Sequence, residues 1–266
     1  MKRILQYLNM LSLIIAVFVN YYVNAKKAGV PSISEISSRY PTLVTPAGYA
    51  FGIWGLIYIA LFVFVVYQLL DIFNKKIDNS FVNDIGWWFI IANLANAAWV
   101  IAFTHDQTGL SVVIMLIIFF SLLKIVLNTD MERWDAPVSI MGFLWWPISL
   151  YFGWITVALI VNIAAWLVSL GWTGAPVSPT LLAILVLLLA GSIFITMIWK
   201  RSMREYASVG VWGIAAIAVK NWNGSPAVAY TALAVALIIF INTGIHGYQN
   251  RATAPFARRI KQIEEH

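Results

Sequence analysis

Residues 46–58 read PAGYAFGIWGLIY, a proline followed by three glycines and four aromatic residues at the start of a long apolar segment. A segment that only had to sit in lipid could be built from Leu, Ile and Val alone. Two interpretations therefore compete for this stretch. Its glycines let helices pack closely, or its aromatic side chains form the walls of a ligand pocket.

The composition of the whole chain identifies a membrane protein. Of its 266 residues, 61% are hydrophobic and only 11% are charged, whereas a soluble domain carries about a quarter charged residues. Apolar runs of about 20 residues, long enough to cross ~30 Å of hydrocarbon, recur along the sequence. The absence of cysteine excludes disulfides, thiolate nucleophiles and cysteine metal ligands. The net charge of +6 lies in loops and tails, which favours anionic lipid headgroups over nucleic acid as partners.

Eight membrane-spanning helices are predicted, so the expected fold class is an all-α, polytopic membrane helix bundle. The spans run roughly over 4–24, 47–73, 83–104, 109–128, 139–170, 178–199, 205–220 and 227–248. The first span has a basic start like a signal peptide, but no small-residue cleavage site follows it, so a retained helix is expected. The span over 205–220 is short and rich in Gly and Ala. If it did not cross, the C-terminus would lie on the other side.

Loop charges predict the orientation of the bundle. With both termini on one side, thirteen basic residues fall on that side and four on the other. This imbalance places the termini in the cytoplasm and suggests a bacterial inner or plasma membrane. The longest loop, 25–46, then lies on the outer side. Its prolines and serines suit either an ordered cap over the bundle or a plain connector.

Ionisable groups are missing from the middle of every predicted span. Asp71, Asp84 and His246 all lie near span ends. Ion-coupled transporters and proton pumps usually need intramembrane ionisable groups, so this class is disfavoured, although facilitated passage of an apolar solute stays open. No phosphate-binding Gly-Lys motif, HExxH motif or histidine pair at metal spacing occurs. The sequence therefore predicts no catalytic and no metal-binding residues.

Three predicted spans carry a stripe of aromatic, small and amide residues at helical spacing. The stripes are Phe51, Trp54, Tyr58 and Phe62; Ala92, Asn96, Trp99 and Phe103; and Tyr151, Trp154, Ala158, Asn162 and Trp166. An amide left unpaired in hydrocarbon costs several kcal/mol. We therefore expect Asn96 and Asn162 to point inward, toward another helix or a bound molecule.

Spacing alone favours helix packing over ligand binding, because Asn between membrane helices most often bonds a neighbouring helix. The indole N–H groups of Trp54, Trp99 and Trp154 keep the ligand interpretation open. An indole N–H inside the bilayer needs a hydrogen-bond partner, which a ligand could supply.

These residues resemble the tryptophan-rich sensory proteins, the TspO/MBR family to which the translocator protein belongs. That family has a proline and a Trp-x-x-x-Tyr spacing in its second helix, Asn-x-x-Trp followed by Phe in its third, and Tyr-x-x-Trp followed by a small residue and Asn in its fifth. The matching residues are Pro46, Trp54 and Tyr58; Asn96, Trp99 and Phe103; and Tyr151, Trp154, Ala158 and Asn162. There are differences: Leu150 replaces a usual proline, Pro147 lies three residues earlier, and Gly48 occupies a position where a pocket Trp is often found.

The resemblance implies a TspO-like five-helix membrane unit over 1–172, with three additional spans over 173–250 and a basic cytoplasmic tail over 251–266. It also implies a cavity that is closed by the first loop and takes hydrophobic, often planar ligands such as porphyrins. The ligand-binding residues expected from it are Phe51, Trp54, Tyr58, Asn96, Trp99, Phe103, Tyr151, Trp154, Ala158 and Asn162.

The function that follows is a membrane receptor, sensor or carrier for a hydrophobic small molecule. No cofactor is required, although a porphyrin or haem-like ligand is a possible occupant. Membrane lipids and the small molecule are the expected partners, nucleic acid is not, and a homodimer stays open. Two alternatives remain. One is a multispan transporter or structural protein without tetrapyrrole binding. The other is photo-oxidative porphyrin breakdown, for which only Trp54 and Trp154 are redox-active and no acid or base lies nearby.

Overall fold

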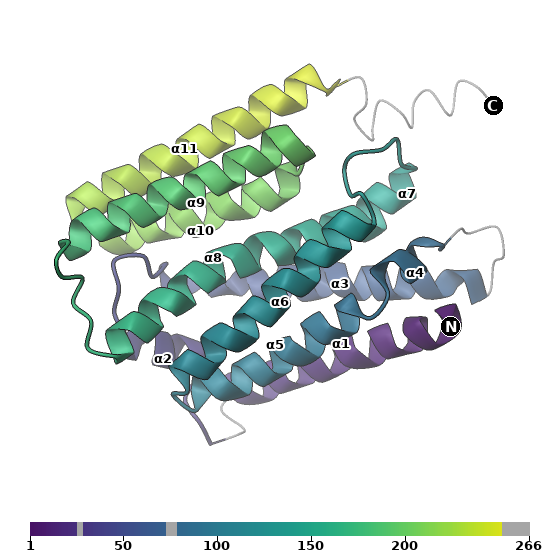
Figure 1. Cartoon of the computed structure of the whole chain (residues 1–266), viewed down its shortest axis with the longest axis horizontal. Coiled ribbons are helices and arrows are strands. Elements are labelled where there is room, and N and C mark those ends of the chain that lie inside the picture. The colour runs from purple at the N-terminus through teal and green to yellow at the C-terminus, as the bar shows by residue number, and fades with distance from the viewer. Residues whose placement is uncertain (26–28, 73–78, 252–266) are drawn as a thin grey trace.

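The computed structural model describes residues 1–25, 29–72 and 79–251, and this part of the chain is a helical bundle without strands (Figure 1). Long helices occupy all eight predicted spans, so the prediction of an all-α bundle is confirmed. They are α1 (Lys2–Asn24), α3 (Ile53–Leu69), α5 (Trp88–Thr104), α6 (Thr108–Asn128), α8 (Trp146–Ser169), α9 (Pro179–Arg201), α10 (Arg204–Asn221) and α11 (Pro226–Gln249). Shorter elements connect them: α2 (Ile33–Arg39), the 3₁₀ turns η1 (Gly48–Gly52) and η2 (Leu70–Ile72), α4 (Phe81–Ile85), α7 (Val138–Ile140) and the π-helical turn η3 (Met141–Trp145).

Length and composition make this an integral, multi-pass membrane protein. Six helical stretches in the described chain are long and apolar enough to cross a membrane, namely Lys2–Asn24, Gly48–Leu69, Thr108–Asn128, Val138–Ser169, Pro179–Arg201 and Pro226–Gln249. The helix α5 is apolar but has only 17 residues. The helix α10 has 18 residues, begins with Arg204 and Glu205, and is the least apolar of the eight.

The helices form two groups (Figure 1). The five-helix unit consists of α1, α3, α5, α6 and α8, and α9, α10 and α11 pack together beside it. The contact runs through α10, which lies against α8. A Cβ atom on Gly153 would lie 2.7 Å from the Tyr206 carbonyl oxygen, and one on Gly213 would lie 2.9 Å from the Val157 side chain. Glycine at both positions therefore lets the two helices approach closely.

The chain crosses the bundle back and forth, so α1 begins and α11 ends at the same end, while α2 lies at the opposite end (Figure 1). Eight long helices are present among the described residues, and six helical stretches are long and apolar enough to cross a membrane. The cytoplasmic position of the termini stays a prediction. Most of the predicted basic tail lies outside the described residues, which end at Arg251. Several of the basic residues that were counted for the orientation also lie outside them, namely Lys26, Lys27, Lys75, Lys76, Arg258, Arg259 and Lys261.

Buried polar side chains attach α1 to α3. The Gln6 amide donates to the Asp71 carboxylate at 2.9 Å, and the Asn9 amide donates to the Gln68 side chain at 2.9 Å. The Lys2 ammonium lies 2.7 Å from Asp71 at the end of the helix pair. Because a polar group buried without a partner is costly, these bonds fix the register of α1 within the bundle.

A proline reshapes the start of α8. Pro147 has no N–H to donate to the carbonyl of Phe143, and the helix widens into the π turn η3 immediately before it. Such π turns are often found at functional sites. Here the turn includes Trp145, which is almost completely buried.

Candidate ligand-binding site

The first loop contains an ordered cap, the helix α2. Its N-terminus has a capping box, in which the Ser32 hydroxyl accepts from the Glu35 N–H at 3.3 Å and the Glu35 carboxylate accepts from the Ser32 N–H at 2.7 Å. An ion pair of 2.6 Å between Arg39 and Asp106 ties the end of α2 to the turn between α5 and α6. Of the two interpretations of loop 25–46, the ordered cap is therefore the one that the described residues support.

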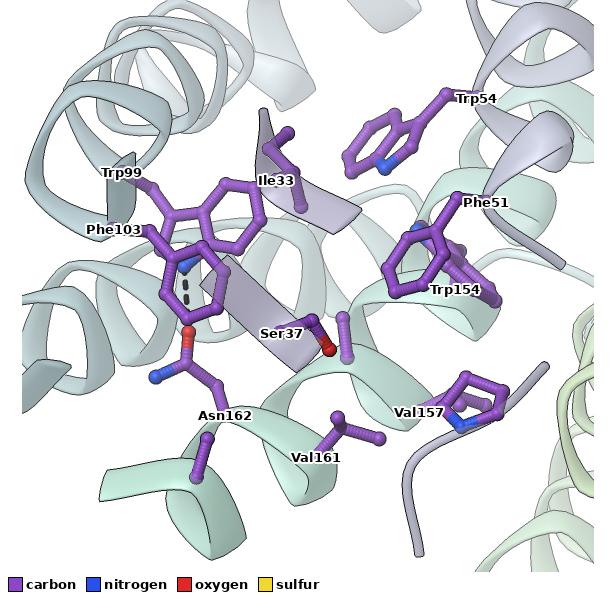
Figure 2. Close-up of a pocket in the computed structure, with 13 residues that line it drawn as sticks. Ile33, Ser37, Phe51, Trp54, Trp99, Phe103, Trp154, Val157, Val161 and Asn162 are labelled. Carbon is purple, nitrogen blue, oxygen red and sulfur yellow. Dashed lines mark hydrogen bonds between the residues drawn. The ribbon is translucent and has the colours of Figure 1, made fainter. Parts of the chain in front are cut away.

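The cap-side cavity lies between α2, η1, α3, α5 and α8 (Figure 2). Its volume is about 30 Å³, and its walls are almost entirely apolar. Seven of the ten predicted ligand-binding residues line it: Phe51, Trp54, Trp99, Phe103, Trp154, Ala158 and Asn162. They come from three helical regions that are distant in sequence. The stripes thus converge around one hollow inside the bundle.

Ring contacts organise the aromatic walls. Phe51 meets Trp154 edge to face with ring centroids 5.9 Å apart, and Trp99 stacks on Phe103 at 5.3 Å. Trp54 stacks on Tyr58, which does not line the cavity, with ring centroids 5.3 Å apart. Aromatic pairs in these geometries stabilise the fold by about 0.5–1.5 kcal/mol each beyond burial. The walls are therefore held in place without a ligand.

Two of the predicted polar groups are already paired. The Trp99 indole N–H donates to the Asn162 side-chain oxygen at 2.7 Å (Figure 2), and the Asn162 amide N–H donates to the Ser111 hydroxyl at 2.8 Å. Asn162 thus bridges α5, α6 and α8. The prediction that this amide points inward is confirmed, and its partners are neighbouring helices.

Tyr58, Asn96 and Tyr151 do not line the cavity, although they were predicted to bind ligand. The Asn96 oxygen accepts from the Asn20 amide at 2.9 Å and from the Tyr58 hydroxyl at 3.2 Å, which connects α1, α3 and α5. The Tyr151 ring lies 5.9 Å from Trp54, and its hydroxyl lies 3.4 Å from the Ala92 carbonyl oxygen. These three residues form a layer that supports Trp54.

Phe62, the last residue of the predicted stripe on α3, does not line the cavity, and its side chain is 55% exposed. The buried face of α3 is set by Ile57, Leu61 and Phe64, and Phe62 lies beside that face.

Six residues that the stripes did not predict also line the cavity: Ile33, Ser37, Pro46, Val157, Val161 and Ala165. Val161 and Ala165 continue the face of Ala158 at helical spacing, so a longer stripe would have found them. Ile33 and Ser37 point into the space from α2 (Figure 2). The Ser-x-x-Glu pattern at 32–35 signals the start of that helix.

The arrangement can recognise apolar surface, but it offers no acid–base chemistry. None of the lining residues in the described chain is ionisable, and no group of three His, Cys, Asp or Glu residues within that part could hold a metal ion. The wall also lacks a His, Cys or Met that could ligate haem iron, so this site does not fit axial haem binding. The Trp154 indole N–H is buried without a hydrogen-bond partner and is the unsatisfied donor on this wall.

Comparison with known proteins places this geometry in a family. The model of a family described as TSPO-like protein matches residues 6–245. The match begins in α1 and ends in α11, so it includes the three C-terminal helices as well as the five-helix unit. No curated protein and no solved structure matches the chain.

Proposed function

Because this chain belongs to the TSPO-like protein family, we propose that it is a membrane receptor, sensor or carrier that binds a hydrophobic, planar small molecule under α2. The family and the helix bundle support a membrane sensor or transporter of small molecules. The identity of the ligand, with a tetrapyrrole as the first candidate, is the proposal's finer part. The observation that carries it is the convergence of Trp54, Trp99 and Trp154 on one capped cavity.

The physical chemistry of the wall suits a flat aromatic ligand. Each ring that stacks on an indole or phenyl face gains about 0.5–1.5 kcal/mol beyond the burial of its surface. Trp154 supplies a buried N–H that lacks an acceptor, and Ser37 contributes a hydroxyl from the cap. A polar atom at the edge of the ligand would satisfy one of these donors and fix its orientation.

A macrocycle can enter only if the walls separate. The cavity volume of about 30 Å³ has room for roughly one or two water molecules, whereas small-molecule pockets are typically about 300–1,000 Å³. The wall best suited to move is α2, a helix of seven residues held at its end by the exposed ion pair between Arg39 and Asp106. Such a surface pair contributes at most about 1 kcal/mol. The proposal therefore includes opening of the cap.

The test is a titration with protoporphyrin IX of the full chain in lipid nanodiscs. Absorbance of the porphyrin itself is the readout, so that loss of a tryptophan does not change the signal. We expect saturable binding in the micromolar range, and weaker binding by Trp154→Phe and Trp54→Phe. Trp87→Phe, at a side chain that is 53% exposed, is the matched control and should bind like the wild type. Absence of saturable binding, or equal affinity of all four proteins, contradicts the proposal.

The second candidate is a transporter or structural membrane protein in which the stripes only pack. The small cavity and the pairing of Asn162 with Trp99 and Ser111 favour it. The substitution Ala158→Leu distinguishes the two, because it fills the cavity with apolar atoms. If the cavity binds a ligand, this variant folds and loses porphyrin binding. If the stripes only pack, neither the wild type nor the variant binds.

A further inference from the structure

A larger cavity lies at the opposite end of the five-helix unit, and we call it the α4-side cavity. It is bounded by the ends of α3 and α6, by α4, and by the segment from the loop before α7 to η3. Its volume is about 500 Å³, which falls in the range of roughly 300–1,000 Å³ that is typical of small-molecule sites. The cap-side stripes contribute no residue to it. It is therefore a separate candidate site.

Four aromatic side chains line this cavity: Tyr67, Phe81, Trp134 and Trp145. The rings of Tyr67 and Phe81 are nearly parallel, with centroids 6.2 Å apart, and Trp134 meets Trp145 edge to face at 5.7 Å. They come from α3, from α4, from the loop after α6 and from η3. Clusters of aromatic faces from separate segments are the usual surroundings of a bound organic cation.

Two residues that line the cavity carry a polar side-chain group without a partner among the described residues, and one of them, Trp145, also lines a smaller cavity with Arg204, Glu205 and His246. Trp145 is only 1% exposed, and its indole nitrogen is buried without a hydrogen-bond acceptor. A buried donor of this kind costs about 1–3 kcal/mol unless a water or a ligand satisfies it. Asp84 contributes an exposed carboxylate on the lining, and it takes part in none of the ion pairs between described residues.

Four basic side chains among the described residues at this end have other partners. Arg133 and Arg201 both pair with Asp130, at 4.0 and 3.6 Å, and Lys2 and Arg3 both pair with Asp71. The cavity therefore has aromatic walls, an unbonded indole donor on one lining residue and a carboxylate that forms no ion pair with another described residue. An anion would be repelled by that charge, and a purely apolar molecule would leave both polar groups unsatisfied.

From this combination we propose that the α4-side cavity binds an organic ammonium group that carries a neighbouring oxygen atom. The ammonium lies against the aromatic faces and near Asp84, and the oxygen accepts from the Trp145 indole N–H. A free choline-like molecule and the choline headgroup of a lipid share this chemistry. The headgroup is a plausible source because the cavity lies at the end of the bundle, where helices meet the membrane surface.

The main experiment compares choline with 3,3-dimethylbutan-1-ol, its neutral isostere. The full chain is placed in nanodiscs of phosphatidylglycerol, which contain no choline, and each compound is titrated by calorimetry. We expect choline to bind roughly tenfold more tightly than the isostere, because only choline gains the cation–π attraction and the attraction of the carboxylate. Equal binding of the two compounds, or binding of neither, overturns the proposal.

Substitutions locate the binding. Asp84→Asn should weaken choline binding about tenfold and leave the isostere unchanged, and Trp145→Phe should weaken both compounds about threefold because it removes the N–H donor and part of the aromatic face. Asp135→Asn, an exposed carboxylate in the loop before α7 that does not line the cavity, is the matched control. Circular dichroism and porphyrin binding at the other end report whether each variant is folded. A folded Asp84→Asn variant with wild-type affinity for choline overturns the proposal.

A second arm identifies the source of the ammonium group. Native mass spectrometry of protein from nanodiscs of mixed phosphatidylcholine and phosphatidylglycerol detects retained lipid. Retained phosphatidylcholine that choline displaces supports the proposal, with the headgroup as source. Choline binding without retained phosphatidylcholine supports it with a free molecule as source. Retained phosphatidylcholine that neither choline nor Asp84→Asn reduces overturns it.

Discussion

The cap-side cavity and the α4-side cavity lie at opposite ends of the five-helix unit and differ in volume, although the wall of each includes one bonded indole, Trp99 or Trp134, and one unbonded indole, Trp154 or Trp145. Beneath α2, the Trp99 indole is bonded to Asn162, Asn162 is bonded to Ser111, and the space left is about 30 Å³. Beside α4, the Trp145 indole has no acceptor and the space is about 500 Å³. The end that carries the sequence motif is nearly filled by its own side chains, and the other end is not.

The bonded and unbonded indoles illustrate two roles that a buried aromatic side chain can have. A polar group whose partner is another helix stabilises the packed state, and a ligand that needs that group must first break a bond. A buried polar group without a partner costs free energy until something binds it. Trp99 belongs to the first kind, and Trp145 and Trp154 belong to the second. An unpaired buried donor is therefore a better indicator than an aromatic stripe of the place where a bound ligand gains the most free energy.

The largest expected effect comes from removing the bridge at the cap-side cavity. Asn162→Leu leaves the Trp99 N–H without its acceptor and removes the donor to the Ser111 hydroxyl, which keeps its bond to the Thr108 carbonyl, and we expect a loss of about 2 kcal/mol in the free energy of unfolding. Unfolding in mixed micelles with increasing SDS measures it. Asn242→Leu is the control, since Asn242 also accepts from an indole, that of Trp199, at 3.0 Å but at an exposed position. If both variants lose the same free energy of unfolding, burial of the Asn162 bridge contributes nothing to stability.

A matched pair of tryptophans tests the distinction between paired and unpaired donors directly. Trp99→Phe removes a bonded N–H and leaves the Asn162 oxygen unsatisfied, whereas Trp154→Phe removes an N–H that has no partner. We expect Trp99→Phe to cost about 1 kcal/mol more in the free energy of unfolding. The same SDS titration measures both. If Trp154→Phe is the more destabilising variant, the Trp154 indole of the wild type is bonded in the membrane. The distinction between a paired Trp99 and an unpaired Trp154 is then wrong.

The cap supplies the next smaller effect. Ser32→Ala removes the side-chain acceptor of the capping box, which typically costs about 0.5–1 kcal/mol. Because α2 has only seven residues and closes the cavity, the loss should appear as faster hydrogen exchange over 33–39 and faster release of bound porphyrin. Ser34→Ala, which leaves the capping box intact, is the control. Unchanged exchange and release rates would show that α2 does not act as the gate.

The positions of the helices could be predicted from sequence because the apolar periodicity is strong. Each predicted span coincides with a helix, and α10 was recognised although it is the least apolar. Phe62 shows the limit of this approach. Its spacing from Tyr58 is helical, but the buried face of α3 follows Ile57, Leu61 and Phe64. Which side of a helix is covered depends on its neighbours, and these are not encoded in local spacing.

The candidate site was predicted only in part for a similar reason. The stripes identified Trp54, Trp99 and Trp154 as side chains that meet, but Asn96 turned out to bond Asn20 of α1 across 76 positions of sequence. A pairing that distant cannot be inferred from one sequence. The volume of a cavity cannot be inferred from sequence either, because it is a small difference between large packed volumes. The α4-side cavity was missed because Tyr67, Phe81, Trp134 and Trp145 form no periodic pattern.

The smallest expected effect is a dependence on pH that should be confined to the end of the bundle away from the cap. Burial, together with the nearby Glu205 carboxylate and against the opposing effect of Arg204, raises the pKa of Glu132, in the loop after α6, to about 8. At pH values between 4.5, the ordinary pKa of this group, and about 8, the folded protein holds a proton that the unfolded chain releases. The free energy of unfolding should therefore fall as pH rises from 5 to 8 and level off above that.

Because the Glu132 side chain is partly exposed, water screens it, and we expect a total change below about 1 kcal/mol. Glu132→Gln should remove that part of the slope. Porphyrin binding beneath α2 should stay constant over the same range, since no lining residue of that cavity in the described chain is ionisable. Unfolding in SDS at pH 5, 6, 7 and 8 measures the slope, and porphyrin titrations at the same pH values provide the comparison. A slope that persists in Glu132→Gln would assign the proton to another group, and a porphyrin affinity that follows the slope would show that the two ends of the unit are coupled.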